Sequence, residues 1–474
     1  MTTSDPLSAC PAHGRAPMYG PEFAATPERI YDELRRQGPA APVELAPGVP
    51  ATLIVGYDAA LEVLRDPGTF PKDPRRWEGK VPADCPVLPM MMYRPNCLFT
   101  DGAVHARLRA VVTDSLPRFG SETLRELVER RADELIDGFA GEGEADLVAQ
   151  YARVLPLLVF NEMFGCPAEL GDRFVFGMSG IFDGLDAEHA NTVLNQAVQD
   201  LVALKRREPG PDVTSWMLAH PARLTDEEMA HQLVVLMGAG TEPEQNLITN
   251  GIRLLLSDAR FAGDLSGGSL PVEDALDEIL WSDPPMANYA VTYPREDVDF
   301  AGVRLPADEP VVISFAAANT DPSRTAGARA GNRAHLAWSA GPHTCPAKGP
   351  ARLIASVAIE KVLDRLPELD LAVPAAELTW RPGPFHRALE ALPVRFPPAP
   401  RTPVAREAPA KHQTADHHQT ANHHRTIPES PAPAPHTAAG PAPGWGGGPP
   451  AEAATPPTAP RRLVRSIVRW WRGG

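Results

Sequence analysis

The sequence is poor in cysteine. Five cysteines occur in 474 residues, and no two of them form a C-x-x-C pair (Cys10, Cys85, Cys97, Cys166 and Cys345). An odd number of scattered cysteines argues against a disulfide framework and against a structural zinc site. The pattern is typical of a protein that works in a reducing cytoplasm.

Long apolar runs are also missing. The longest are residues 154–160 and 233–239, and both are much shorter than the roughly 20 residues that span a bilayer. Residues 1–20 are polar and broken by proline and glycine, so they match neither a signal peptide nor a membrane anchor. These absences predict a cytoplasmic protein without an integral membrane segment.

Charge and proline content divide the chain near residue 397. The whole chain has a net charge of −15, yet residues 398–474 carry nine Lys or Arg against four Asp or Glu, so the preceding part is strongly acidic. An acidic body argues against nucleic acid as a partner. Residues 398–460 are rich in Pro, Ala, Thr and His and have almost no large aliphatic side chains, which predicts a disordered linker.

The last residues, 461–474, form a different pattern. Apolar side chains fall on one helical face, and arginines fill most of the remainder (Leu463, Val464, Ile467, Val468, Trp470 and Trp471). This predicts a basic amphipathic helix that binds either an anionic membrane surface, at the inner face of the membrane, or an acidic partner. The histidine pairs of the repeat that starts at His412 are typical of a metal-binding tract or of low-complexity drift in a linker.

Residues 25–397 are predicted to form one mainly α-helical domain with a minor antiparallel β-sheet, preceded by an N-terminal extension at 1–24. Amphipathic spacing predicts helices at 27–37, 121–139, 225–257 and 350–366. Thr225 and Glu228 have the spacing of a capping box at the start of the longest helix. Short alternating segments predict strands at 43–45, 51–56, 303–305 and 311–315.

Cys345 lies in a loop rich in glycine and proline, directly before a predicted helix. Unpaired backbone N–H groups and the helix dipole at such a position favour a thiolate over a thiol. A thiolate placed there can ligate iron. On the local sequence alone, a lone cysteine near a helix start is more often a small buried residue that fills space.

The residues around Cys345 resemble the haem-binding loop of the cytochrome P450 family. That signature reads Phe-Gly-x-Gly-x-His-x-Cys-x-Gly, and the segment Trp338 to Ala347 keeps its second glycine, histidine and cysteine as Gly341, His343 and Cys345. The resemblance spans about 25–397 and points to bacterial, actinobacterial members. It implies the P450 fold and a haem b whose iron is ligated by Cys345.

A second region of resemblance is a His-x-x-x-Arg pattern after an Asp-Gly turn. His105 and Arg109 follow Asp101-Gly102 and stand one helical turn apart, so both can donate to one anionic group. On its own this spacing is also typical of a solvated basic face. The resemblance implies that His105 and Arg109, together with His335 and His343, contact the haem propionates.

The activity that the resemblance implies is that of a haem-thiolate monooxygenase. Such an enzyme inserts one oxygen atom from dioxygen into a small hydrophobic substrate, with electrons from a ferredoxin-type donor. An alternative is a haem-binding protein with lost or altered oxygen activation: a redox sensor, a peroxide-driven enzyme, or a scaffold in a membrane-associated assembly.

The long central helix departs from the family pattern. The family has an acid followed by an alcohol there, and these relay protons, whereas this chain has Thr241-Glu242-Pro243. Pro243 has neither a hydroxyl nor a backbone N–H. Glu242 and Thr241 are nevertheless the candidate catalytic residues.

A neighbouring helix lacks the arginine of the family's Glu-x-x-Arg pair, because the residue three positions after Glu278 is Trp281. A buried glutamate without a cation would be costly. We therefore expect one of three nearby arginines to pair with Glu278 (Arg324, Arg329 or Arg333).

The residue after the cysteine is a further departure. Pro346 has no N–H to donate to the sulfur of Cys345. Hydrogen bonds from nearby amides reduce the charge on a ligating sulfur, so their loss predicts a more electron-rich ligand.

Overall fold

The computed structural model describes residues 14–183, 187–261, 272–324 and 332–399. The predictions for residues 1–13, for the linker beyond residue 399, for the histidine repeat and for the basic helix at 461–474 lie outside the described residues.

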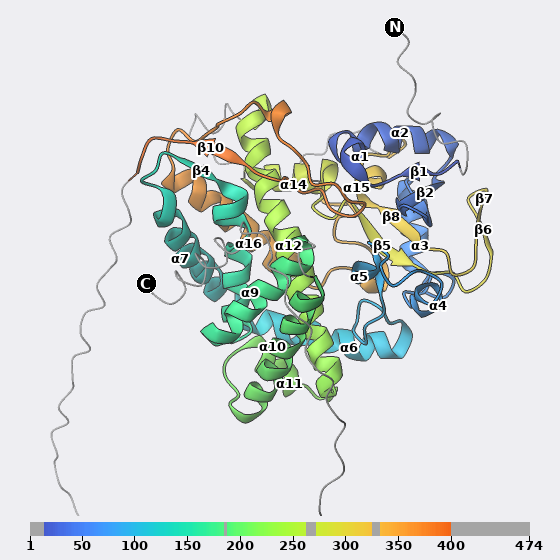
Figure 1. The fold of residues 1–474 in the computed structure, drawn as a ribbon, viewed down its shortest axis with the longest axis horizontal. Coiled ribbons are helices and arrows are strands. Elements are labelled where there is room, and N and C mark those ends of the chain that lie inside the picture. Colours follow the sequence, from blue (N-terminus) through green and yellow to red (C-terminus); the bar gives the residue numbers. More distant parts are fainter. Residues whose placement is uncertain (1–13, 184–186, 262–271, 325–331, 400–474) are drawn as a thin grey trace, which may run out of the picture. The chain divides into compact units, whose positions relative to one another are not determined.

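A five-stranded sheet joins three strands from the first part of the chain with two strands from residues 288–314 (Figure 1). Its strands are, in spatial order, β1 (Ala16–Pro17), β2 (Ala40–Ala46), β3 (Val49–Ile54), β8 (Val311–Ser314) and β5 (Asn288–Thr292). The β2–β3 pair is antiparallel, as predicted, and the β5–β8 pair is antiparallel too, although no strand was predicted at β5. The β1–β2 and β3–β8 pairs are parallel. The long connection between β3 and β8 permits this parallel pairing, so the sheet is mixed.

Two smaller sheets complete the β-structure. One contains β4 (Glu144–Asp146), β10 (Pro393–Arg395) and β9 (Asp370–Leu371), and the other pairs β6 (Val298–Phe300) with β7 (Val303–Leu305). The rest of the described chain is mainly helical, which confirms the predicted fold class.

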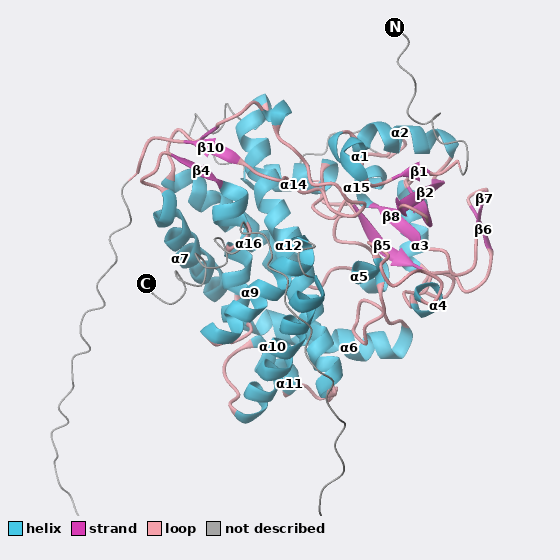
Figure 2. Ribbon diagram, in the orientation of Figure 1, coloured by secondary structure: helices cyan, strands magenta, loops and turns pink. Residues whose placement is uncertain are grey.

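Figure 2 shows the main sheet together with short helices and a separate group of long helices. The helices near the main sheet are α1 (Gly20–Ala25), α2 (Pro27–Gln37), α3 (Tyr57–Arg65), α4 (Arg75–Glu78), α5 (Leu88–Met91) and α15 (Phe315–Asn319). The others are α6 (Gly102–Ser115), α7 (Ser121–Phe139), α8 (Leu155–Met163), α9 (Ala168–Asp183), α10 (Ala187–Arg207), α11 (Val213–Leu218), α12 (Asp226–Ser257), α14 (Val272–Ser282) and α16 (Lys348–Arg365).

The longest helix, α12, begins and continues as its sequence indicates. The Thr225 hydroxyl accepts the backbone N–H of Glu228, and the Glu228 carboxylate accepts the backbone N–H of Thr225, so the predicted capping box is confirmed. The helix is continuous across Pro243 and contacts α8, α10, α14 and α16. It is therefore the central helix of the bundle.

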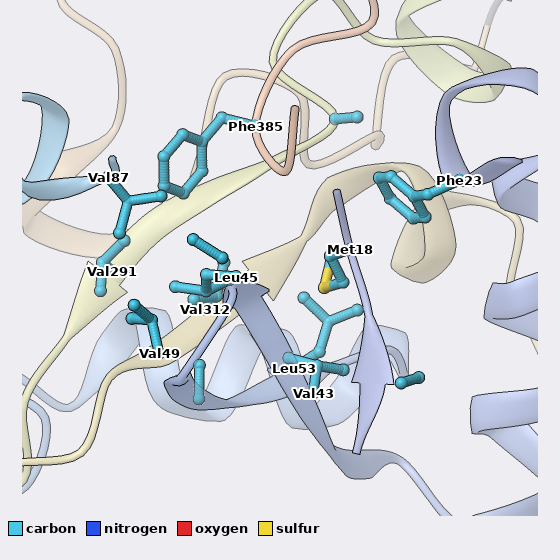
Figure 3. Close-up of a cluster of buried hydrophobic side chains, with 14 of the residues drawn as sticks. Met18, Phe23, Val43, Leu45, Val49, Leu53, Val87, Val291, Val312 and Phe385 are labelled. Atoms are coloured by element: carbon cyan, nitrogen blue, oxygen red, sulfur yellow. The ribbon is translucent and has the colours of Figure 1, made fainter. Parts of the chain in front are cut away.

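Chain segments before residue 25 already belong to the packed structure. Ala16 and Pro17 pair with Val43 and Glu44, and Met18 and Phe23 are buried in the apolar cluster beside the sheet. Figure 3 shows these side chains together with Leu45, Leu53, Val291 and Phe385. None of the described helices is long and apolar enough to span a membrane.

Candidate functional site

The loop that carries Cys345 is closed by hydrogen bonds and by a glycine. The backbone N–H of Cys345 donates to the carbonyl of Trp338 over 2.8 Å. Gly341 has a φ of +67°, and a Cβ there would lie 2.3 Å from the carbonyl oxygen of Leu64 in α3. Only glycine fits this approach and this conformation. The loop thereby holds the half-buried Cys345 three residues before α16 begins at Lys348.

Burial decides the protonation of Cys345. It raises the pKa of the thiol, although the Ala347 amide that donates to the sulfur and the charge of Arg109 act in the opposite direction. The backbone amide therefore acts in the predicted direction, and burial opposes it. A metal cation deprotonates a coordinating thiol outright, so the site remains suited to an iron ligand.

Helix α6 brings two of the predicted residues to this loop. The ring centroids of His105 and His343 are 4.0 Å apart in an edge-to-face arrangement. His343 Nε2 lies 3.0 Å from Asp101 Oδ1, and the Arg109 guanidinium donates to the carbonyl of Thr344. The structure thus brings His105, Arg109 and His343 together beside the cysteine loop.

The other predicted histidine, His335, lies against Trp281. Their ring centroids are 5.8 Å apart, and burial lowers the pKa of His335 to about 4, so the ring is neutral at pH 7. His335 Nδ1 is buried and has no hydrogen-bond partner among the described residues. A buried ring nitrogen without a partner is costly unless a ligand supplies one.

These residues fit a haem in their chemistry. The half-buried thiol can ligate iron, and the two imidazoles, the guanidinium and the unpartnered His335 nitrogen can hold carboxylates. Among the described residues, no group of three or more His, Cys, Asp or Glu is arranged to hold a metal ion without such a cofactor.

Glu242 and Thr241 are both buried in α12, and both already have hydrogen-bond partners within the protein. The Glu242 carboxylate pairs with Arg381 and accepts from Asn246 Nδ2 over 3.3 Å. The Thr241 hydroxyl donates to the carbonyl of Met237 over 2.7 Å. The catalytic roles of Glu242 and Thr241 therefore stay predictions.

A second acid on α12 was not foreseen. Glu244 is buried, and burial raises the pKa of its carboxyl well above the usual range although the Ala355 amide donates to it. A glutamate one position past a proline gave no sequence signal for burial.

A cluster of ion pairs, called the brace below, connects α14 with α16 and is centred on Asp277. Its carboxylate pairs with Arg352 of α16 and accepts from Arg333 Nε over 3.1 Å. Both arginines also reach Glu273. Trp281, which stands where the family has an arginine, donates from its indole N–H to the carbonyl of Asn332 over 2.7 Å.

Two of the three arginines expected near Glu278 pair with other acids, so the pairing of Glu278 with one of the three stays a prediction for the third. Arg333 pairs with Asp277 and Glu273, and Arg324 pairs with Asp58. Arg329 lies outside the described residues. Glu278 itself lies 3.5 Å from Arg260, which follows α12. The buried acid of the brace is one residue earlier than the motif indicates.

Comparison with known proteins yields close relatives, although no family model matches the chain. Over 393 residues the chain is 33% identical to the cytochrome P450 monooxygenase PikC of Streptomyces venezuelae. The aligned region covers 80% of this chain and 92% of that protein. The solved structure of CYP154C4 from Streptomyces sp. W2061 is 29% identical, has a TM-score of 0.73, and covers 80% of this chain and 97% of that one. Myxobacterial CYP267B1, solved in complex with myristic acid, is 27% identical with a TM-score of 0.70, covering 80% and 98%.

Proposed function

The chain belongs to the bacterial cytochrome P450 family, and from this membership we propose that it is a haem-thiolate monooxygenase that inserts one oxygen atom into a small organic substrate. When bound, the haem supplies the binding and reductive activation of dioxygen. The observation that carries the proposal is the placement of a half-buried cysteine in a closed loop beside His105, His343 and Arg109.

Each residue of the proposed site has a separate task. Cys345 ligates the iron, and Gly341 lets its loop approach α3 closely. His105, Arg109, His335 and His343 would hold the propionates through N–H donors. Three of them now have carbonyl or carboxylate partners: His105, Arg109 and His343. Hydrogen bonds to the propionates would orient the cofactor.

Glu242 is proposed to move protons, with Thr241 as a neighbouring hydroxyl. The ion pair with Arg381 holds the Glu242 carboxylate inside α12 and links it to the loop after β9. For proton transfer the carboxylate must exchange this partner for water. Thr241 can contribute only when its hydroxyl leaves the carbonyl of Met237.

The partners follow from the same class of enzyme. We propose a small hydrophobic substrate and an electron donor of the ferredoxin type, since a monooxygenase takes two electrons for each turnover. The cytoplasmic location stays a prediction. Contact of residues 461–474 with an anionic membrane or an acidic partner also stays a prediction, because that segment lies outside the described residues.

The proposal is tested by absorption spectroscopy of the purified full-length chain. The protein as isolated, or after reconstitution with haem, should show a thiolate-type Soret shift when it is reduced under carbon monoxide. Haem without that shift would mean a protonated or displaced sulfur. A chain that takes up no haem would overturn the proposal.

A second function, haem binding with altered oxygen activation, is favoured by one feature, Pro243. Replacing it by threonine restores a hydroxyl next to Glu242, and replacing it by alanine restores only the backbone N–H for the carbonyl of Ala239. With surrogate electron donors, we expect Pro243→Thr to lower peroxide release several-fold and Pro243→Ala to leave it unchanged. Equal peroxide release from all three proteins would favour the altered-activation function.

The missing amide after Cys345 gives a prediction about reduction potential. The Ala347 amide already donates to the sulfur, whereas Pro346 cannot. Pro346→Leu adds a donor that stabilises charge on the sulfur, so we expect the reduction potential of the haem-loaded protein to rise. Spectroelectrochemical titration measures the change, with Pro350→Leu in α16 as the control. A lowered or unchanged potential would contradict the argument.

A further inference from the structure

Lys72 is a buried lysine next to the proposed site. Its side chain is only 6% exposed, and its Nζ donates to the carbonyls of Ala290 over 2.7 Å and Val291 over 3.2 Å. Its backbone N–H donates to Asp101 Oδ2 over 2.6 Å. The other oxygen of that carboxylate binds His343, so one residue, Asp101, ties Lys72 to the cysteine loop.

The acceptors of Lys72 come from an irregular part of β5. That strand is in register with β8 at Tyr289 and again at Thr292, and the register shifts between them. Ala290, inside the shift, has a φ of +50°. A bulge of this kind takes backbone groups out of the ladder. The Val291 side chain stays among the buried apolar side chains (Figure 3). Its carbonyl accepts a hydrogen bond from Lys72.

The charge of Lys72 is not matched by a carboxylate. Within the described ranges, no Asp or Glu lies within 4 Å of Nζ, and its two acceptors are neutral carbonyls. Burial lowers the pKa of Lys72 to about 8 although Asp101 acts in the opposite direction. Lys72 is therefore still mainly charged at pH 7. A buried ammonium without an anion is costly unless a ligand provides one.

Lys72 lines a small cavity whose other walls are mostly apolar. The cavity is bounded by Met91, Leu98, Phe99, Tyr289 and Tyr293 in addition to the β5 bulge, and it has room for about one water molecule. The Tyr293 hydroxyl is buried and has no hydrogen-bond partner in the described part of the chain. An ammonium and a free hydroxyl in one apolar cavity are suited to a carboxylate.

We propose that Lys72 and Tyr293 form a subsite for a carboxylate of a bound ligand. The inference rests on the proposed function, because that function brings two sources of a carboxylate to this region: the haem propionates and an acidic substrate. Met91 is an unbranched wall of the cavity and can move to admit the group. The rival role for Lys72 is purely structural, as a donor to the carbonyls of the bulge.

Variants of Lys72 separate these roles. Lys72→Gln keeps N–H donors for the bulge and removes the charge, whereas Lys72→Arg keeps the charge. Tyr293→Phe removes the hydroxyl and leaves the bulge untouched. Each full-length variant, freed of haem, is titrated with haem and with haem dimethyl ester, and binding is followed by Soret absorbance. The loaded proteins are then titrated with myristic acid and with methyl myristate, followed by the absorbance change on binding.

If a propionate binds at Lys72, the ratio of the affinity for haem to the affinity for its dimethyl ester should fall about tenfold in Lys72→Gln. This ratio should fall less in Tyr293→Phe and stay unchanged in Lys72→Arg. A substrate carboxylate at Lys72 instead predicts an unchanged porphyrin preference and about tenfold weaker binding of myristic acid, but not of its ester.

Unchanged preferences in both ligand pairs would overturn the subsite and leave Lys72 as a donor to the bulge. If Lys72→Gln fails to fold, unchanged preferences in Tyr293→Phe have the same meaning. Wild-type protein that binds neither porphyrin would overturn the proposed function and this inference with it. Normal haem binding without an effect of either residue would overturn the inference alone.

Discussion

Replacing Cys345 by serine is expected to abolish the thiolate-type Soret shift of the reduced, carbon monoxide-treated protein completely. Serine preserves the backbone hydrogen bond to Trp338 and the size of the side chain, so the loop should keep its shape. Its hydroxyl cannot provide a thiolate to the iron. The measurement is the reduced carbon monoxide difference spectrum of the full-length variant, after haem content has been equalised.

Cys97 provides the matched control. Cys97 is buried, and burial raises the pKa of its thiol, while the charge of Arg109 acts in the opposite direction. Cys97→Ser should leave the Soret shift unchanged, because the thiol is not in the closed loop before α16. A shift that survives in Cys345→Ser and disappears in Cys97→Ser would move the iron ligand to Cys97.

Local sequence signals predicted the helices well and the sheet less well. The helix over 225–257 was predicted because its capping box is encoded in adjacent residues, and the structure confirms it. The strand predicted over 311–315 ends one residue early, because Ser314 accepts the Ala317 N–H and starts α15 at Phe315. The mixed sheet depends on the pairing of β3 with β8, which local patterns do not encode.

Motif matching placed the cysteine loop and the α6 pair together, and it could not foresee burial. His105, His343 and Arg109 do gather beside Cys345. The sequence analysis did not foresee that burial raises the pKa of the Cys345 thiol, because a helix terminus is visible in sequence and desolvation is not. Lys72 gave no signal at all, since its burial depends on the distant strand β5.

The brace shows most clearly what a motif leaves open. Adjacent residues on a helix point in directions about 100° apart, so a motif that names an acid does not determine which neighbour faces the next helix. Glu278 matches the motif, yet Asp277 is the buried acid that pairs with Arg352 and Arg333. Asp277 should therefore contribute most of the free energy by which the brace stabilises the fold.

Replacing Asp277 by asparagine is accordingly expected to lower the free energy of unfolding by about 3 kcal/mol, because removing one partner leaves the largely buried Arg352 without its anion. The side chain of Asp277 is 9% exposed, whereas the side chain of Glu273, which contacts the same two arginines, is 51% exposed. Glu273→Gln should therefore cost less than about 1 kcal/mol. Denaturant unfolding of both full-length variants gives the comparison, and equal losses would mean that the two acids share the brace rather than Asp277 carrying it.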